Sequence, residues 1–415
     1  MHFFPSRLLV IATALALTAG LVPSAQAVGE KPAPDTLVPV MDTEFYQIAS
    51  RKIAVPVGSP YITALGPTNV LSLDWDFELA VTDISTGTSR ALGSLGLPAE
   101  SRVLDIYWDS LMSRNGSGAN VMVAYGEFGV DKCRRSVLRE ARIDLTGAGA
   151  NSLGTVWFTS PCYPAMEGYP LSQSGGRITR ALTSITGVKN PRQFFFTIGD
   201  FALSRAQMDA LPAKSRKYLT TATLLTGPRE AQIWARGLRN AQGLTTAFVD
   251  NKHVLLATLH GPRGGDQINV VERDGDYGWP YYSYGTPYGG DQPQNTAKNQ
   301  GYTNQKYPPL FAWVPSIGPT SVIQVSGPMY FSWWGNGQNT SDVIVNGMGT
   351  HWLYRLRIDD GAVRYVEPIF TGVRLRTLIK MPNGALVGGI DTSSSELIVF
   401  SPSGIWDSSG GYKAL

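Results

Sequence analysis

Short apolar runs bounded by turn-forming residues cover most of the chain. They are rich in Val, Ile, Leu, Tyr and Phe, which favour strands, and they lie at 70–74, 77–83, 120–125, 136–143, 193–198, 254–259, 343–346, 353–358, 375–380, 385–388 and 397–400. Turn signals such as Asp360-Gly361 and Pro382-Asn383-Gly384 stand between them. Helical periodicity is confined to a short stretch at 205–211 and a second candidate at 109–114. The pattern predicts an all-β protein.

The number of these strands narrows the architecture. Many short strands with turns between them are typical of a sandwich, a barrel or a propeller. A sandwich of this length would split into several domains, yet we find no convincing linker, and the polar stretch at 292–305 is interpreted as a long surface loop. Radial repetition lets one propeller grow to this size. We therefore predict a single β-propeller domain over 28–415, with separate sandwich domains as the alternative.

Composition excludes several other classes of protein. Only 16% of the 415 residues are charged, against an average of about 25%, while 43% are hydrophobic and 45 are Gly. This composition rules out a disordered tail and a long coiled coil. The formal net charge of +3 argues against nucleic-acid binding driven by phosphate neutralisation.

The N-terminal segment has the features of an export signal. Arg7 precedes an apolar stretch at 8–22, and Ala25-Gln26-Ala27 supplies the small-x-small pattern of a cleavage site. A transmembrane anchor is the alternative, but the stretch is short of the ~20 residues that span a bilayer. We predict that residues 1–27 are a signal peptide cleaved after Ala27, and that the mature chain is periplasmic or secreted with no membrane span.

The chain has two cysteines, Cys133 and Cys162. In an oxidising compartment such a pair can form a disulfide. A reactive thiol or a metal site is the alternative, but there is no Cys-x-x-Cys spacing and no His lies near either residue. We predict a structural disulfide.

Three motifs follow one another in the middle of the chain. Residues 237–244 read Gly-Leu-Arg-Asn-Ala-Gln-Gly-Leu, residues 259–269 read Leu-His-Gly-Pro-Arg-Gly-Gly-Asp-Gln-Ile-Asn, and residues 276–280 read Asp-Tyr-Gly-Trp-Pro. In this order and spacing they resemble the soluble quinoprotein glucose/sorbosone dehydrogenases, the aldose sugar dehydrogenases that use pyrroloquinoline quinone (PQQ). The resemblance covers roughly residues 100–400 and implies a six-bladed β-propeller of four-stranded antiparallel blades, with residues 28–100 expected to supply the first blade.

The resemblance also implies which residues would hold the cofactor. PQQ carries several carboxylates, and Arg offers a flat, permanently charged fork for such groups. The candidate cofactor-binding residues are Arg239, Asn240, His260, Asp266, Arg374 and Arg376, with Asn240 on a quinone oxygen and Asp266 bracing the loop. The alternatives are a solvated Arg-x-Arg pair on a strand and a structural histidine.

Calcium is the second group that the resemblance implies. In the family a Ca²⁺ sits on the cofactor, held in part by main-chain carbonyls that correspond here to Gly261 and Pro262. Carbonyl oxygens suit this hard cation, which would polarise the quinone as a Lewis acid.

The sequence departs from the family at the catalytic base. The family has a His two residues before a Gly/Ser-Gly-Arg turn, which here is Gly175-Gly176-Arg177. The matching residue is Gln173, which cannot titrate. No His lies between His2 and His253, and a Lys that the family often carries near 346–349 is also missing. Asp200, His260 and His351 are the other candidate bases.

Three functional hypotheses follow. The first is an exported PQQ- and Ca²⁺-dependent dehydrogenase that oxidises a sugar hydroxyl by hydride transfer to the quinone and passes electrons to an unknown acceptor. The second is a catalytically impaired relative that binds a sugar or glycan at the propeller mouth. The third is a glycan-cleaving enzyme on the same scaffold that uses His260, Asp200 or Asp266.

Overall fold

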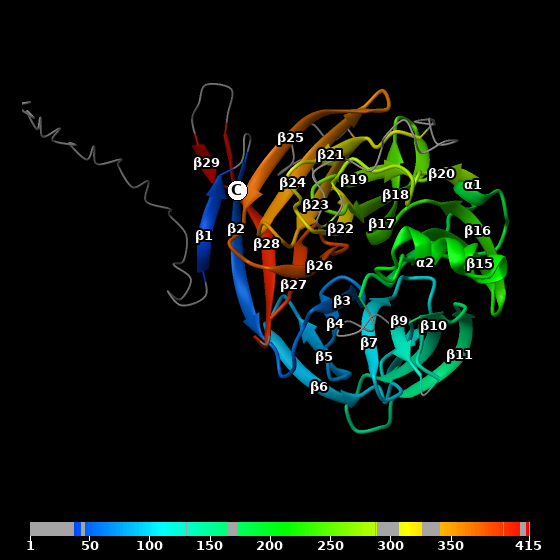
Figure 1. The fold of residues 1–415 in the computed structure, drawn as a ribbon. Helices are drawn as coiled ribbons and strands as arrows, with labels where there is room; N and C mark the ends of the chain where they lie inside the picture. The colour runs from blue at the N-terminus through cyan, green and yellow to red at the C-terminus, as the bar shows by residue number, and fades with distance from the viewer. Residues whose placement is uncertain are drawn as a thin grey trace, which may run out of the picture. The chain divides into compact units, whose positions relative to one another are not determined.

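The computed structural model describes residues 37–42, 46–129, 131–164, 172–286, 288, 307–325, 341–392, 394–406 and 412–414. Within the unit Ala33–Leu415, six small antiparallel sheets surround a central axis (Figure 1). This arrangement confirms the predicted six-bladed β-propeller. The predicted signal peptide and the loop at 292–305 lie outside the described residues.

The first three blades run in chain order. The first contains β3 (Tyr61–Ala64), β4 (Asn69–Leu73), β5 (Glu78–Asp83) and β6 (Thr88–Ser94). The second contains β7 (Ser101–Tyr107), β9 (Gly118–Phe128), β10 (Cys133–Asp144) and β11 (Ser152–Thr159), with the short β8 (Arg114–Asn115) and β12 (Tyr163–Pro164). The third contains β13 (Gly175–Arg180), β14 (Phe194–Ile198), β15 (Thr221–Gly227), β16 (Glu230–Arg236) and the short β20 (Gly275–Asp276).

The last three blades complete the ring. The fourth contains β17 (Asn240–Val249), β18 (Lys252–His260), β19 (Asp266–Val270) and β21 (Phe311–Trp313). The fifth contains β22 (Pro319–Gln324), β23 (Ser341–Gly347), β24 (Trp352–Asp359) and β25 (Ala362–Phe370). The sixth contains β26 (Leu375–Lys380), β27 (Leu386–Ile390), β28 (Glu396–Trp406) and β2 (Tyr46–Ala54), with β1 (Leu37–Asp42) and β29 (Tyr412–Ala414) at its edge.

The ring is closed by strands from both ends of the chain. Blue β2 pairs antiparallel with red β28, with Arg51 opposite Val399 (Figure 1). This pairing corrects the expectation that residues 28–100 supply the first blade, because β2 belongs to the sixth blade and the first blade begins at Tyr61. Ladder hydrogen bonds between the two termini thereby fix the last blade to the start of the fold.

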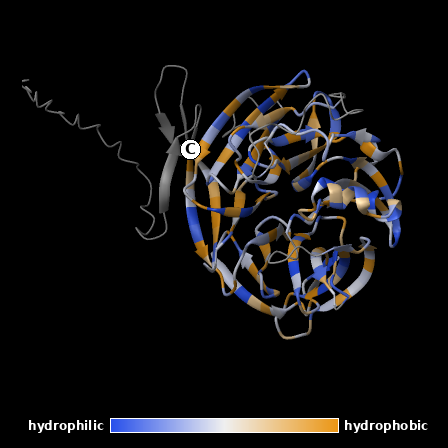
Figure 2. Cartoon of the chain, viewed as in Figure 1, coloured by the Kyte–Doolittle hydropathy of each residue, from blue (hydrophilic) through white to orange (hydrophobic). Residues whose placement is uncertain are grey.

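Hydrophobic residues pack between neighbouring blades. Figure 2 shows hydrophobic and hydrophilic residues interspersed along the strands. One buried cluster joins the first and second blades and includes Leu71, Leu79, Val121 and Ile143. Burial of such side chains stabilises the fold by roughly 1.5–3 kcal/mol each.

The short helices test the periodicity argument. α2 (Arg205–Ala210) confirms the stretch predicted at 205–211, and Ser204 and Gln207 form a capping box at its start. The structure also has α1 (Thr183–Thr186) and α3 (Ala213–Arg216). The candidate helix at 109–114 is wrong, because the Asp109 carboxylate accepts the backbone N–H of Leu111 and holds a turn instead.

Six inner strands surround the axis, namely β3, β7, β13, β17, β22 and β26, and residues of all six line one central cavity. Each blade starts on its inner strand, so these strands begin at the same face, which we call the mouth. Contacts across the mouth join neighbouring blades; for example, the Gly175 N–H donates to the Asn240 side chain at 3.1 Å.

Two further predictions concern covalent structure and membrane spans. Cys133 and Cys162 form a disulfide with Cα atoms 5.0 Å apart, as predicted. Among the described residues, no helix is long and apolar enough to cross a membrane.

Candidate active site at the mouth

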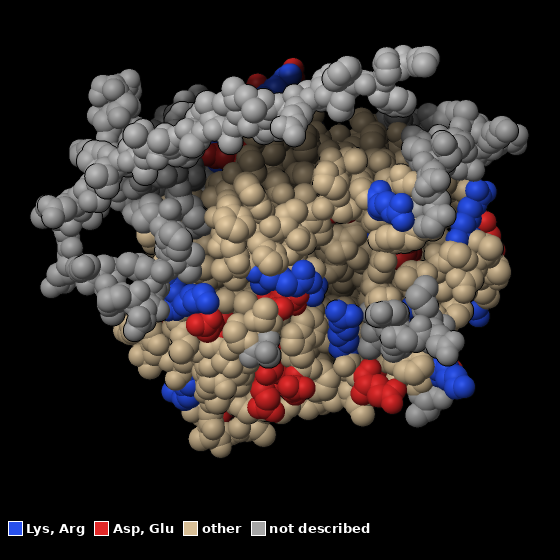
Figure 3. Space-filling view, turned by 60° about the vertical axis from the view of Figure 1, so that its left-hand side comes forward, with Lys and Arg blue, Asp and Glu red and all other residues tan. Residues whose placement is uncertain are grey.

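A cavity of about 600 Å³ opens at the mouth beside the third and fourth blades. Its lining includes Gln173, Asp200, Arg239, Pro262 and Trp279. The space therefore brings together residues from the three sequence motifs and from the position of the missing base. Figure 3 shows one face of the molecule, on which basic side chains stand beside acidic ones among large uncharged areas.

Gln173 enters this cavity from a tightly built turn. Its backbone φ is 51°, and its carbonyl accepts the backbone N–H of Phe201 at 3.0 Å. A Cβ on Gly199 would lie 1.9 Å from that carbonyl oxygen, so glycine is required there. The side-chain Oε1 of Gln173 is buried and has no hydrogen-bond partner among the described residues. The turn thus presents an unsatisfied amide oxygen beside the cavity.

Asp200 is the carboxylate of this cavity. It is 1% exposed, and its Oδ2 lies 3.6 Å from Nε of Arg239. Burial raises the pKa of Asp200, while the charge of Arg239 acts in the opposite direction. A buried carboxyl with a raised pKa and a cationic neighbour is a typical proton acceptor in an active site.

A second buried arginine lies behind Asp200. Arg134 is fully buried, donates to the carbonyl of Phe201 at 2.6 Å and stacks over the Phe201 ring at 5.3 Å. Burial lowers the pKa of Arg134 to about 10, and the charge of Asp200 opposes this shift. Asp200 therefore lies in the field of two guanidinium groups.

Arg239 connects the cavity to the loop of the second motif. Its Nη1 donates to the carbonyls of His260 at 2.8 Å and Gly261 at 2.6 Å, and its guanidinium stacks over Trp279 at 5.0 Å. Its Nε has no hydrogen-bond partner among the described residues. Arg239 is thus held by its Nη1 bonds and its ring contact, while Nε faces Asp200 across 3.6 Å without a hydrogen bond and can serve an anionic ligand.

His260 is held as a neutral imidazole. Its Nε2 lies 2.9 Å from the carbonyl oxygen of Pro319, and its Nδ1 lies 3.4 Å from the side-chain amide of Asn240. These partners assign Nε2–H as the donor and Nδ1 as the acceptor. Burial lowers the pKa of His260 to about 4, against the opposing charge of Asp266. Because both ring nitrogens are engaged, the geometry favours a positioning role over that of a base.

The side chain of Asn240 contacts three other residues of the mouth. Its Oδ1 accepts the Gly175 N–H at 3.1 Å and the amide of Gln242 at 3.2 Å, while its Nδ2 faces His260. One amide hydrogen remains for the quinone oxygen that the resemblance implies.

Asp266 braces the loop, as the sequence predicts. Its carboxylate is 1% exposed and accepts the backbone N–H groups of Gly261, Ile317 and Gly318, each at 2.8 Å. The hydroxyl of Ser316 adds a longer bond at 3.3 Å. Four donors saturate this carboxylate, so it joins the fourth and fifth blades and is not available as an acid or base.

The two carbonyls assigned to calcium do not form a metal site by themselves. Ca²⁺ takes six to eight oxygen ligands. The Gly261 carbonyl already accepts the guanidinium of Arg239, and no cluster of three or more acidic, His or Cys side chains suited to a metal occurs among the described residues. These residues alone do not fit the ion, and we assign it no chemical step.

Arg374 and Arg376 stand on another side of the mouth. Both donate from Nε to the single carboxylate of Asp391 at 2.8 Å. Arg376 also stacks over Trp75 at 5.4 Å, and Arg102 stacks over the same ring at 5.4 Å. Two cations share one anion here, which leaves positive charge for a carboxylate ligand.

His351 does not line the mouth cavity. Its carbonyl accepts the hydroxyl of Thr371 at 2.8 Å, and its N–H donates to the carbonyl of Gly347. The backbone of His351 thus joins the turn after β23 to the segment before β26.

Sequence reasoning missed several residues of the mouth. Trp75, Arg102 and Arg134 act through contacts between segments far apart in the chain, so no local spacing indicates them. Asp391 was missed as well, although it lies only 15–17 residues from its partners Arg376 and Arg374. Trp279 lies within the third motif, and its apolar ring before a proline was a signal that could have assigned it to the cavity wall.

The mouth fits PQQ in its polar and flat surfaces. Three buried polar atoms of lining residues have no hydrogen-bond partner among the described residues, namely Oε1 of Gln173, Nε of Arg239 and Nε1 of Trp279, whose flat ring also borders the cavity. Arg376 and Arg239 both bring positive charge close enough to His260 to lower its pKa. A planar ligand with several carboxylates matches this arrangement.

Comparisons with known proteins agree with the motifs. Residues 223–399 match the family Glucose / Sorbosone dehydrogenase. The aldose sugar dehydrogenase YliI of Escherichia coli is 30% identical over 175 residues, which are 41% of this chain and 44% of that protein. The uncharacterized protein slr1608 of Synechocystis is 30% identical over 168 residues, 40% of this chain and 38% of that protein. The matches thus span less than half the length of either relative.

Solved structures share the fold. The soluble aldose sugar dehydrogenase from Escherichia coli, in its apo form, has a TM-score of 0.65 and 21% identity over 86% of this chain and 99% of that one. The PQQ-bound form of aldose sugar dehydrogenase from Streptomyces coelicolor has a TM-score of 0.57 and 18% identity over 85% and 97%. The family resemblance drawn from the motifs is confirmed.

Proposed function

We propose that this chain, whose residues 223–399 match the Glucose / Sorbosone dehydrogenase family, is a PQQ-dependent dehydrogenase that oxidises a sugar hydroxyl. The observation that carries the proposal is the mouth cavity, where the buried Asp200 carboxylate, Arg239 and the unsatisfied amide of Gln173 meet. PQQ, when bound, supplies the acceptor for the hydride that leaves the sugar carbon.

Asp200 is the proposed proton acceptor. Its raised pKa makes it a stronger base than an exposed carboxylate, and Arg239 at 3.6 Å stabilises its charged form. It takes the hydroxyl proton as the hydride departs from the adjacent carbon, so the sugar loses one proton and one hydride. Gln173 cannot accept a proton, and its free Oε1 instead accepts a hydrogen bond from a sugar hydroxyl.

The arginines hold the cofactor in this proposal. Arg239 binds a carboxylate through its unused donor and offers Trp279 as a flat neighbour. Arg374 and Arg376 bind from the other side, where Asp391 neutralises only one of the two charges. Asn240 and His260 orient each other and keep the mouth rigid.

The test is sugar-dependent dye reduction after incubation with PQQ and Ca²⁺, over a panel of aldoses. Wild type is expected to turn over at least one sugar, and Asp200→Asn to lower the rate by about 10²–10⁴-fold, as loss of a general base does. Exposed Lys189→Gln is the control and is expected to match wild type. Absence of turnover with every sugar would overturn the proposal.

A second candidate function is binding of a sugar or glycan without turnover. It is favoured by one observation, the non-titrating Gln173 where the family has its base. Under this hypothesis Gln173→His gains dye-reducing activity that the wild type lacks. Activity in wild type that Gln173→His does not increase contradicts it.

The glycan-cleaving alternative needs two free carboxyl groups beside the substrate. Of the two candidate carboxylates, Asp266 is saturated by four hydrogen bonds, and Asp200 lines the mouth cavity. The geometry gives this alternative no support.

Export belongs to the proposal as well. We infer that residues 1–27 direct secretion and that the mature protein starts at Val28. N-terminal sequencing of the protein recovered from the periplasm or medium tests this, and an intact residue 1 on exported protein would contradict it.

A further inference from the structure

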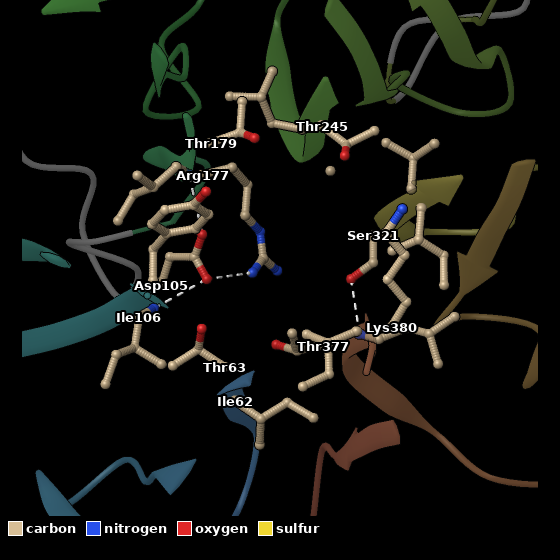
Figure 4. A pocket seen from close by; sticks show the side chains of 18 of the residues that line it. Ile62, Thr63, Asp105, Ile106, Arg177, Thr179, Thr245, Ser321, Thr377 and Lys380 are labelled. Atoms are coloured by element: carbon tan, nitrogen blue, oxygen red, sulfur yellow. Dashed lines mark hydrogen bonds and ion pairs between the residues drawn. The ribbon is translucent and has the colours of Figure 1, made fainter. Parts of the chain in front are cut away.

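A second cavity, of about 390 Å³, lies between the six inner strands (Figure 4). It shares no lining residue with the mouth cavity. Hydroxyl side chains form much of its wall, contributed by Thr63, Thr179, Thr245, Ser321 and Thr377. Aliphatic side chains such as Ile62, Ile106 and Leu378 form other parts of the wall, so the chamber has mixed polarity.

Arg177 projects into the chamber. It is 4% exposed, and Figure 4 shows its guanidinium reaching into the space between the strands. Its Nη1 lies 3.2 Å from Oδ1 of Asp105, and its Nη2 donates to the carbonyl of Arg376 at 3.3 Å. Its Nε is buried and has no hydrogen-bond partner within the described part of the chain.

Thr377 supplies a second unsatisfied donor beside it. The residue is 5% exposed, and its Oγ1 has no partner among the residues that the structure describes. The bond from Arg177 to the carbonyl of Arg376 places the guanidinium next to the peptide that leads into Thr377. Both residues line the chamber, and a buried donor without a hydrogen bond destabilises the fold until a ligand or water satisfies it.

The charges of the chamber do not balance. Its lining contains Arg177, Lys380 and a single carboxylate, Asp105. Asp105 is already engaged by the N–H groups of Ile106 and Ile178, each at 3.0 Å, as well as by Arg177.

Lys380 lies at the end of β26 remote from the mouth. Its Nζ donates to the carbonyl of Gln324 at 3.3 Å. Desolvation lowers its pKa, and no acidic side chain acts in the opposite direction. The far rim of the chamber thus carries a cation without a counter-charge among the described residues.

We propose that this chamber binds a small oxyanion of phosphate or sulfate size. The anion accepts hydrogen bonds from Nε of Arg177 and Oγ1 of Thr377, and Lys380 at the far rim attracts it. Guanidinium and hydroxyl donors are the groups that proteins use for such anions, and the bound charge balances the excess cation. The site is independent of the dehydrogenase proposal.

The first test is a titration of the full-length protein with phosphate, with sulfate and with chloride at constant ionic strength, followed by the melting temperature. A saturable rise is expected with phosphate or sulfate. Thr377→Val and Lys380→Gln are expected to weaken the apparent affinity at least tenfold, whereas exposed Lys189→Gln leaves it unchanged. An equal, unsaturable response in all variants would overturn the proposal.

The second test locates the anion. Crystals soaked in selenate are expected to give an anomalous peak between Arg177 and Thr377, and crystals of Thr377→Val to lose it. A chamber that holds only water in such crystals would contradict the proposal even if the melting temperature rises, because the stabilising anion would then lie elsewhere.

Discussion

Two groups of buried arginines in this propeller differ in how completely they are neutralised. In the fifth blade, Arg355 is 1% exposed and lies 2.7 Å from Glu367 and 2.9 Å from Asp342. At the mouth, Arg239 is also buried, but its nearest carboxylate, Asp200, is 3.6 Å away and its Nε makes no hydrogen bond within the described residues.

This difference distinguishes a buried ion-pair network with a structural role from a buried arginine in a functional site. The network of Arg355 closes on itself, and Arg357 adds a further bond to Asp342 at 2.9 Å. Such a group is satisfied without any ligand. Arg239 and Gln173 instead line a cavity with a donor and an acceptor that make no hydrogen bond within the described residues, as expected where a ligand completes the bonding. Buried charge indicates a functional site only where its hydrogen bonding is incomplete.

We expect the largest effect on the free energy of unfolding when the Arg355 ion-pair network is broken. Arg355→Met leaves Glu367 buried without its cation and Asp342 with Arg357 as its remaining partner, and we expect a loss of about 3–5 kcal/mol in the free energy of unfolding. Urea denaturation measures it, with Arg364→Gln as the control, since that arginine is half-exposed and lies 3.9 Å from Asp359. Equal midpoints for Arg355→Met and the control would contradict the structural role.

Substitution of Asp266 tests whether the mouth also contains a hydrogen-bond network that is complete without a ligand. Asp266→Asn keeps the size of the side chain but turns an NH₂ group toward backbone donors, so we expect destabilisation by about 1–3 kcal/mol. Denaturation again provides the measurement. Unchanged stability would show that the four bonds to Asp266 do not brace the loop.

The pH dependence of stability tests His260. Its pKa is about 4 in the folded protein and 6.5 ordinarily, so between these values the unfolded chain binds the proton. Stability from this residue is present above pH 6.5 and is lost as the pH falls toward 4, with a slope of at most about 1.4 kcal/mol per pH unit. His260→Gln removes this contribution, while Asp200 and Asp105, whose pKa values are raised, titrate in both proteins. A constant stability difference between wild type and variant across this range would contradict a neutral, buried His260.

The fold and part of the site could be predicted from the sequence. Short apolar runs predicted the propeller because each strand is a local pattern. The motifs found Arg239, Asn240, His260 and Asp266 because these residues lie on or directly before three consecutive strands of one blade, β17, β18 and β19. Contacts between blades carry no such signal. Within the sixth blade, the motifs also did not indicate Asp391, which pairs with Arg374 and Arg376 at the β26–β27 hairpin.

The chamber behind the mouth shows the same limit. Arg177 stood in a recognised turn, but its partner Asp105 is 72 residues away, in the preceding blade. Pairing of β2 with β28 likewise joins segments that no periodicity connects. Ring closure in a propeller is a property of the whole chain.

Titration of the full-length protein with PQQ in the presence of Ca²⁺, followed by the absorption of the bound quinone, tests the central claim most directly. We predict saturation at one quinone per chain, with an affinity that Arg239→Met weakens at least tenfold and Arg364→Gln leaves unchanged. No bound quinone, or equal affinity in Arg239→Met and wild type, would contradict the assignment of the mouth as the cofactor site.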